Sequence, residues 1–386
     1  MRNVIKILHL SDLQAGSDCL AECNDGPLNI EDSYKRYADK LVNDVSTMLN
    51  GDIPDILVLS GDIASKGQPH EYDYASIFLQ NLTSQLKISP NNIVIVPGNH
   101  DVNWALLEKN YKKKHRGAKF NKDICASMED KMFSFQGWLN QVYPKKLRYN
   151  YSLGNPIVFN KIQKPQILVV GLDSCERITY RRQDNIGSIS IKQVGKACKY
   201  IEKNGKDKIN IVVMHHNPFP FDNESSCLKA SKPILKMLDQ AGVHLILAGH
   251  MHKAIKATHE TGTPFNMHTL TTGPCYLKPK GRTFPIQGYK HQEVFPNRYQ
   301  LLFLDLTSKT VTALLRRFSF ERMTNGTFGN WTYDADPEFV DFYGSHTLPL
   351  PQKGIVKPLH KKISEEVSQA LMYDIIEKQK LRATKM

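Results

Sequence analysis

The chain has 386 residues, of which 41% are hydrophobic and 23% charged, a composition typical of a folded protein with one large domain or two smaller ones. No apolar run approaches the roughly 18–20 residues needed to span a bilayer, and seven cysteines without a CxxC pair argue against a disulfide framework. We therefore expect a cytoplasmic protein without a membrane segment. The net charge of +13 favours anionic partners such as nucleotides or nucleic acid.

Short, largely apolar segments, typical of strands buried on both faces, recur along the first 250 residues. They lie at Ile5–Leu10, Ile56–Ser60, Ile93–Val96, Ile167–Leu172, Ile209–Met214 and Leu245–Ala248. The first of these is too short for a secretory signal and is interpreted as a core strand. Apolar spacing predicts helices over Ile30–Leu49, Ile191–Ile201 and Ile234–Gln240. Further strands are expected around His268–Leu270, Tyr299–Leu304 and Val311–Phe318. This order predicts an α/β fold in which layers of mixed sheet are covered by helices.

Two regions stand apart from this pattern. The segment Trp104–Tyr151 is basic and poor in strand signals, and it fits either a lid or a solvated helical excursion. Its first half holds Lys109, Lys112, Lys113, Lys114, Arg116, Lys119 and Lys122. The C-terminal tail ends in an amphipathic pattern over Ile363–Leu381. We expect that helix to dock on the main domain or on a second copy of the chain.

Five of the predicted strands run directly into polar residues that can bind metals. These clusters are Asp12-Leu13-Gln14, Gly61-Asp62, Gly98-Asn99-His100-Asp101, His215-His216 and Gly249-His250-Met251-His252. The carboxyl ends of strands in an α/β sheet line the ligand crevice, so the five clusters are expected to converge on one edge. Each cluster alone is weak, but five in this order are hard to obtain by chance.

This order resembles the signature of the calcineurin-like metallophosphoesterases, and the resemblance covers roughly residues 1–318. It implies a four-layer α/β/β/α sandwich, with a catalytic domain at 1–320, a helical basic insertion or lid at 102–151 and a C-terminal extension at 321–386. The stretch Gly171-Leu172-Asp173-Ser174, followed by Gly187–Ser190 and Gln193, is similar to the class III cyclic-nucleotide phosphodiesterase branch.

The resemblance also implies a role for each position. Asp62 bridges two divalent ions of the Mn, Fe, Zn or Ni type, with Mn favoured. The first ion is held by Asp12, Asp62 and His252, and the second by Asp62, Asn99, His215 and His250. A water between the two ions attacks the phosphoester in line. His100 lies over the phosphate as a charge stabiliser or proton donor, and Asp101 orients His100 or a neighbouring ligand.

Two positions need a separate decision. His215 closes the Val212-Val213-Met214-His215 pattern, so it is taken as the ligand and His216 as a neighbour that contacts substrate. Gln14 stands where the family usually has histidine. Its amide oxygen is a weaker donor to these metals, which predicts either a weakly occupied first site, a preference for harder ions such as Mn or Mg, or an impaired enzyme.

The motifs indicate the reaction but leave the substrate open. A phosphodiester of nucleotide-like type is favoured by the Gly171–Gln193 stretch. DNA or RNA is the alternative, from the net charge and the lysine cluster, with Tyr111, Phe120, Phe133, Phe135 and Trp138 available for base stacking or for core packing. A catalytically weakened metal-binding scaffold is the non-enzymatic alternative.

Overall fold

The computed structural model describes residues 3–16, 29–106, 109, 129–145, 151–176, 186–218, 228, 231–251, 255–257, 265–275, 281–286, 289–294, 297–322, 328–333 and 345–350. His252, residues 107–108, 110–128 and 146–150 of the basic insertion, and the segment predicted to form a C-terminal helix lie outside the described residues. Within the described part, no helix is both long enough and apolar enough to cross a membrane.

One mixed sheet carries the N-terminal half of the site. Its strand order is β14 (Phe328–Tyr333), β13 (Thr310–Arg322), β12 (Arg298–Asp305), β1 (Val4–Leu10), β2 (Ile56–Ser60) and β3 (Ile93–Val96), with β15 (Ser345–Pro349) also paired to β13. Strands β1, β2 and β3 run parallel, so their carboxyl ends meet at one edge. Strand β12 pairs antiparallel to β1 and extends the sheet on the other side.

A second sheet carries the other half. Its order is β4 (Ile157–Val158), β5 (Ile167–Gly171), β6 (Ile209–Val213), β7 (Leu245–Ala248), β9 (His268–Thr271) and β8 (Ile255–Ala257). Strands β5, β6, β7 and β9 are parallel. Strands β10 (Gly281–Ile286) and β11 (Tyr289–Val294) form a separate antiparallel pair.

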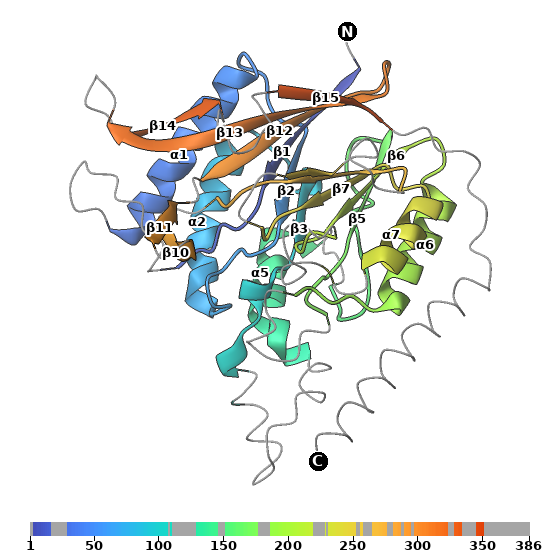
Figure 1. Cartoon of the computed structure of the whole chain (residues 1–386), viewed down its shortest axis with the longest axis horizontal. Helices are drawn as coiled ribbons and strands as arrows, with labels where there is room; N and C mark the ends of the chain where they lie inside the picture. Colours follow the sequence, from blue (N-terminus) through green and yellow to red (C-terminus); the bar gives the residue numbers. More distant parts are fainter. Residues whose placement is uncertain are drawn as a thin grey trace.

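Helices cover the outer faces of both sheets, which confirms the predicted α/β/β/α sandwich. Figure 1 shows α1 (Ile30–Met48) and α2 (Pro69–Gln85) on one side of the strands, and α6 (Ile191–Asn204) and α7 (Ser231–Gln240) on the other. Helix α1 buries Tyr34, Tyr37, Leu41 and Val45 from one stripe, at the three- and four-residue spacing of an amphipathic helix. The two sheets face each other closely, because a Cβ atom at Gly171 in β5 would lie 2.7 Å from Val96 in β3.

The second half of the insertion packs into the molecule. Helix α5 (Phe133–Val142) follows a short 3₁₀ turn, η4 (Glu129–Met132), and lies against α2. Phe135 is fully buried and Trp138 nearly so, and the Trp138 indole donates to Ser76 of α2 at 2.9 Å. Core packing therefore explains these two aromatic side chains, whereas Phe133 is 66% exposed.

Candidate metal centre

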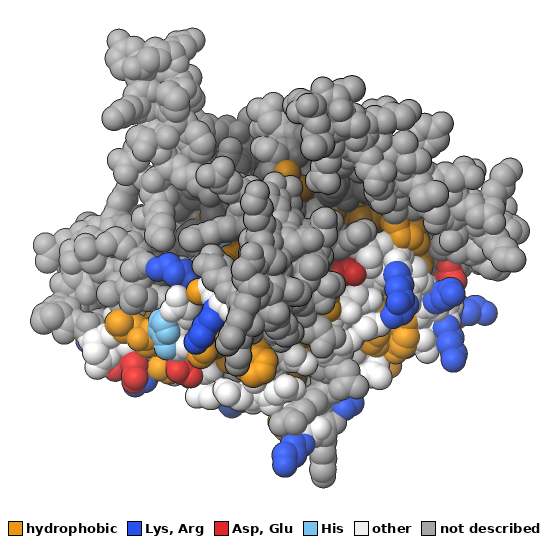
Figure 2. Space-filling model, turned by 90° about the horizontal axis from the view of Figure 1, so that it is seen from below, with side chains coloured by type: hydrophobic (Ala, Val, Ile, Leu, Met, Phe, Trp, Pro, Cys, Tyr) orange, Lys and Arg blue, Asp and Glu red, His pale blue; other side chains and the backbone are white. Residues whose placement is uncertain are grey.

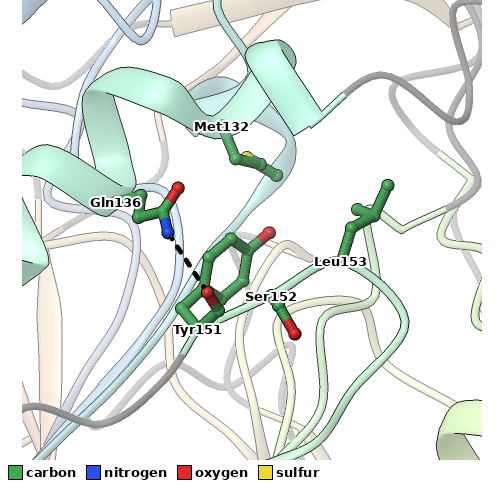
Figure 3. Close-up of a pocket in the computed structure, with 5 residues that line it drawn as sticks. All are labelled: Met132, Gln136, Tyr151, Ser152 and Leu153. Carbon is green, nitrogen blue, oxygen red and sulfur yellow. Dashed lines mark hydrogen bonds between the residues drawn. The ribbon is translucent and has the colours of Figure 1, made fainter.

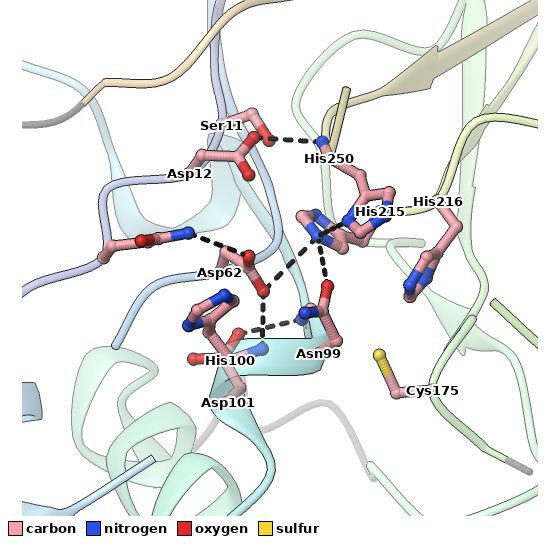
Figure 4. A network of polar contacts seen from close by, with 12 residues as sticks. Ser11, Asp12, Asp62, Asn99, His100, Asp101, Cys175, His215, His216 and His250 are labelled. Carbon is pink, nitrogen blue, oxygen red and sulfur yellow. Dashed lines mark hydrogen bonds and ion pairs between the residues drawn. The ribbon is translucent and has the colours of Figure 1, made fainter. Parts of the chain in front are cut away.

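The predicted ligands lie together at the carboxyl ends of strands from the two sheets (Figure 4). Asp12 follows β1, Asp62 follows β2, and Asn99 lies in the 3₁₀ turn η3 (Asn99–Asp101) after β3. His215 and His250 follow β6 and β7 from the opposite sheet. The centre therefore sits where the two sheets meet.

Asp12 and Asp62 lie on two loops that share an unusual backbone conformation and are hydrogen-bonded to each other. Both residues have a left-handed backbone, with φ of 54° and 53°. The backbone N–H of Asp12 donates to the carbonyl of Gly61 at 3.0 Å, and that of Gln14 donates to the carbonyl of Asp62 at 2.8 Å. Left-handed geometry costs energy in a residue other than glycine, and cross-bonding between loops is what sustains such strain at functional positions.

The Asp62 carboxylate is approached from several sides. Its Oδ1 accepts the backbone N–H of His100 at 2.8 Å and lies 3.3 Å from Nε2 of His215. A Cβ atom at Gly98 would meet Oδ1 at 2.2 Å, so only glycine fits there. Burial alone would raise the pKa of Asp62, but His215, His100 and these hydrogen bonds lower it far below its usual value. The side chain is thus held as an anion, as a bridging ligand requires.

The His215 ring is oriented by the backbone of β2. Its Nδ1 donates to the carbonyl of Ser60 at 2.8 Å, which turns Nε2 toward the centre. That nitrogen lies 3.0 Å from Oδ1 of Asn99 and 3.3 Å from Nδ1 of His250. Burial disfavours a charged ring, yet Asp62 outweighs burial and raises the pKa of His215 to about 9. The surroundings of Nε2 therefore favour positive charge.

The donor set fits a divalent metal. Ligand atoms of Asp12, Asp62 and His215 all lie within 4.8 Å of one another, and all three residues are buried. The backbone N–H of His250 donates to Asp12 at 3.1 Å, which ties β7 to β1 at the centre. Carboxylate oxygen and imidazole nitrogen without thiolate suit Mn, Fe, Zn or Ni.

Gln14 presents a donor to this centre. Its side-chain Nε2 donates to Oδ2 of Asp62 at 3.3 Å, and the residue is only 4% exposed. In this arrangement the amide nitrogen of Gln14, not its oxygen, faces the Asp62 carboxylate. Ligation of a metal by Gln14 stays a prediction.

His100 and Asp101 are held by different groups. Nδ1 of His100 donates to the carbonyl of Ser65 at 2.7 Å. Asp101 accepts from the backbone N–H groups of Gly98 at 2.8 Å and Ala64 at 3.0 Å, and from the hydroxyl of Tyr72 at 3.0 Å. Burial, together with nearby Asp62, raises the pKa of Asp101 to about 7.

Of its two predicted roles, Asp101 fits the orientation of a neighbouring ligand. Among the described residues its carboxylate forms no hydrogen bond with the His100 ring and instead ties the loop after Asp62 to the loop after β3. The contacts favour orientation of a neighbouring ligand, while Ser65 orients His100. Ser60 and Ser65 act through backbone carbonyls, which leave no signal in a sequence.

Comparison with known proteins decides the family. The family model "Calcineurin-like phosphoesterase" matches residues 5–254. The chain belongs to the calcineurin-like phosphoesterase family.

Individual relatives of this calcineurin-like phosphoesterase are distant. The chain is 25% identical over 234 residues to the uncharacterized metallophosphoesterase-like protein YydB of Bacillus subtilis (strain 168). That match covers 55% of this chain and 44% of the relative, so the chain spans less than half of the relative's length.

Among solved structures, it is similar to a dimetal phosphatase from Danio rerio (15% identity, 81% and 96% of the two chains, TM-score 0.43). It is also similar to the calcineurin-like phosphoesterase YfkN from Bacillus subtilis (12% identity, 97% and 98%, TM-score 0.38).

Beside the centre of this calcineurin-like phosphoesterase, the Gly171–Gln193 stretch supports His216. The Ser174 hydroxyl lies 2.7 Å from Nδ1 of His216 and accepts its backbone N–H at 3.1 Å. The His216 ring packs against that of His250, with centroids 4.3 Å apart. A Cβ atom at Gly187 would meet the ring at 2.4 Å, so glycine is required there. His216 is fully buried behind His250, and its contact with substrate stays a prediction.

A small cavity lies beside the start of α5 (Figure 3). It has a volume of about 20 Å³ and is lined by Met132, Gln136, Tyr151, Ser152 and Leu153. The Tyr151 hydroxyl donates to Asp173 at 2.7 Å, which connects the cavity wall to the segment after β5. A cavity of this size holds about one water, so it is no substrate pocket.

Proposed function

We propose that this protein hydrolyses phosphodiesters of nucleotide-like type with two divalent metal ions. The observation that carries the proposal is the buried group of Asp12, Asp62 and His215, whose ligand atoms lie within 4.8 Å of one another. Asn99 and His250 adjoin it through Nε2 of His215.

The residues divide into two ligand sets. Asp12, Asp62 and His252 would hold the first ion, and Asp62, Asn99, His215 and His250 the second. When bound, two such ions lower the pKa of a water and neutralise charge on the phosphoryl oxygens. Asn99 adds a neutral oxygen, so the site keeps positive charge for a phosphate. Mn is favoured because oxygen donors dominate the first set.

The hydrogen bonding of His100 leaves one ring nitrogen available to contact the phosphate. Because Nδ1 donates to Ser65, Nε2 is the ring atom left to meet a substrate oxygen. His100 is only partly buried, whereas Asp12, Asp62, Asn99 and His215 are buried. We infer that Nε2 stabilises developing charge or delivers a proton to the leaving oxygen.

The preference for a diester rests on the second sheet. Ser174, which belongs to the stretch that is similar to class III phosphodiesterases, anchors His216 beside His250. We infer that this stretch shapes the part of the site that binds the second ester group of the phosphodiester.

The free thiols of Cys175, Cys198 and Cys275 are in keeping with a reducing, cytoplasmic setting.

The test is a substrate panel on Mn-loaded protein. We expect bis-p-nitrophenyl phosphate to be hydrolysed at least about tenfold faster than p-nitrophenyl phosphate. A preference for the monoester would overturn the assignment to diesters. Inactivity on both esters, with two metals bound, would identify a metal-binding scaffold instead.

A further inference from the structure

On α6 and α7, the outer helices of the second sheet, every exposed residue is a lysine. Helix α6 has four exposed residues, and all are lysine: Lys192, Lys196, Lys199 and Lys203. Helix α7 has two, Lys232 and Lys236. We call these six residues the lysine face. Figure 2 shows blue side chains gathered at the right, on the side where Figure 1 places α6 and α7.

The other outer layer has no such bias. The exposed positions of α1 are Glu31, Lys35, Asp39, Asn43 and Thr47. Those of α2 are Pro69, His70, Asp73, Gln80, Ser84 and Gln85. A lysine-rich composition alone would place exposed lysines on both helical layers. The concentration of exposed lysines on α6 and α7 is therefore specific to that side.

Helix stability does not explain the lysine face. On α6 the lysines follow one another at intervals of four, three and four residues and so share one face. Like charges at this spacing destabilise a helix by about 0.2–0.5 kcal/mol per pair. In the part of the chain that the structure describes, Lys192, Lys199, Lys203, Lys232 and Lys236 form no ion pair. Lys196 donates to the side chain of Asn155.

The lysine face begins beside the metal centre. Gln193, in the first turn of α6, accepts the backbone N–H of Asp173 at 2.7 Å. Ser174, the next residue, holds His216 against the ligand His250. From Lys192 to Lys203 the helix then extends about 16 Å, at about 1.5 Å per residue. A chain of phosphates entering the centre could continue along this line.

We propose that the lysine face binds the phosphate backbone of a polynucleotide. Lysines that neutralise phosphates release the counter-ions condensed on the nucleic acid, which supplies sequence-independent affinity of this kind. A lipid surface fits less well, because membrane-binding helices insert apolar side chains. Here Val194, Ala197, Cys198 and Ile201 of α6 are buried in the core instead. Only the choice of phosphates as the anion rests on the proposed function.

The experiment is fluorescence anisotropy with a labelled single-stranded 30-mer DNA. Full-length protein is titrated in EDTA, so the result does not depend on hydrolysis. The test variant carries Lys→Gln at 192, 196, 199 and 203. The control variant carries Lys→Gln at 35, 87, 145 and 309, exposed lysines elsewhere, so both lose the same charge. Lysine and glutamine have similar helix propensities, and thermal melting verifies folding.

We expect the test variant to bind at least about tenfold more weakly than the control. The slope of log K against log salt should also fall by about 2–3, since each lost phosphate contact removes about 0.7. Equal affinity of the two variants would overturn the proposal. The proposal would also be overturned if the wild-type protein did not bind DNA but bound phosphatidylserine vesicles or polyglutamate through these lysines.

Discussion

The side-chain amide nitrogen of Gln14 lies 3.3 Å from Oδ2 of Asp62, so an amide N–H donates to the carboxylate shared by both predicted metal sets. Imidazole at this position would add a nitrogen ligand to the first set. We therefore expect Gln14→His to bind the first metal at least about tenfold more tightly. Calorimetric titration of Mn into metal-stripped protein measures this. Gln85→His, on the surface of α2, is the control, and matching affinities for wild type and Gln14→His would refute the expectation.

Removal of the His100 ring should separate chemistry from metal binding. The hydrogen bond from His100 to Asp62 comes from its backbone N–H, which His100→Ala retains. We expect metal content to stay at the wild-type level and kcat on bis-p-nitrophenyl phosphate to fall about 10²–10⁴-fold, the range for a lost acid–base group. Metal analysis and steady-state kinetics give both readouts. Exposed His70→Ala is the control, and unchanged turnover in His100→Ala would show that the ring has no role.

Much of this centre follows from the strands alone. Apolar runs such as Ile56–Ser60 coincide with the observed strand, because strands buried on both faces need uninterrupted apolar residues. Helix α2 was missed, although Pro69 at its start and Glu71, which accepts the backbone N–H of Gln68, are helix-start signals. The edge strands β14 and β15 were missed because their pairing with β13 depends on distant parts of the chain.

The supports of the site were harder to predict than its ligands. Ligand types and strand ends pointed to Asp12, Asp62, Asn99, His215 and His250. The orientation of His215 and His100, however, comes from the carbonyls of Ser60 and Ser65, which any residue could supply. The contacts of Asp101 with Ala64 and Gly98 likewise depend on how two loops meet.

His9 in β1 should make stability depend on pH. Gln300 donates to its Nδ1 at 2.6 Å, so Nε2 carries the proton and donates to Ser60 at 2.8 Å. Burial, partly opposed by Asp12, lowers the pKa of His9 to about 3. The unfolded chain takes up this proton near pH 6.5, whereas the folded chain does so only near pH 3. Stability from the neutral ring is therefore complete above pH 6.5 and is lost as the pH falls.

At pH 5 this loss is about 2 kcal/mol, at about 1.4 kcal/mol per pKa unit. Urea unfolding in EDTA at pH 7.5 and pH 5 measures it. We expect His9→Gln to be less stable at pH 7.5 but to lose about 2 kcal/mol less than wild type between the two pH values. Exposed His70→Gln should behave as wild type. An identical pH dependence in His9→Gln would contradict the assignment.

Ser174 should act through His216. Its hydroxyl contacts both the ring and the backbone N–H of His216. We expect Ser174→Ala to raise KM for bis-p-nitrophenyl phosphate about tenfold, equivalent to about 1.4 kcal/mol, with metal content unchanged. Ser174→Thr, which keeps the hydroxyl, should restore KM. Ser188→Ala is the neighbouring control, and a purely structural role would instead appear as lost thermal stability with normal KM.

Metal stoichiometry of catalysis tests the central claim most directly. Metal-stripped protein is titrated with Mn while hydrolysis of bis-p-nitrophenyl phosphate is followed, in parallel with Asp62→Ala. The account predicts activity that rises to a plateau at two equivalents of Mn in the wild type and stays at background in Asp62→Ala. Wild-type protein that binds two equivalents and remains inactive, or Asp62→Ala that matches it in rate, would contradict the account.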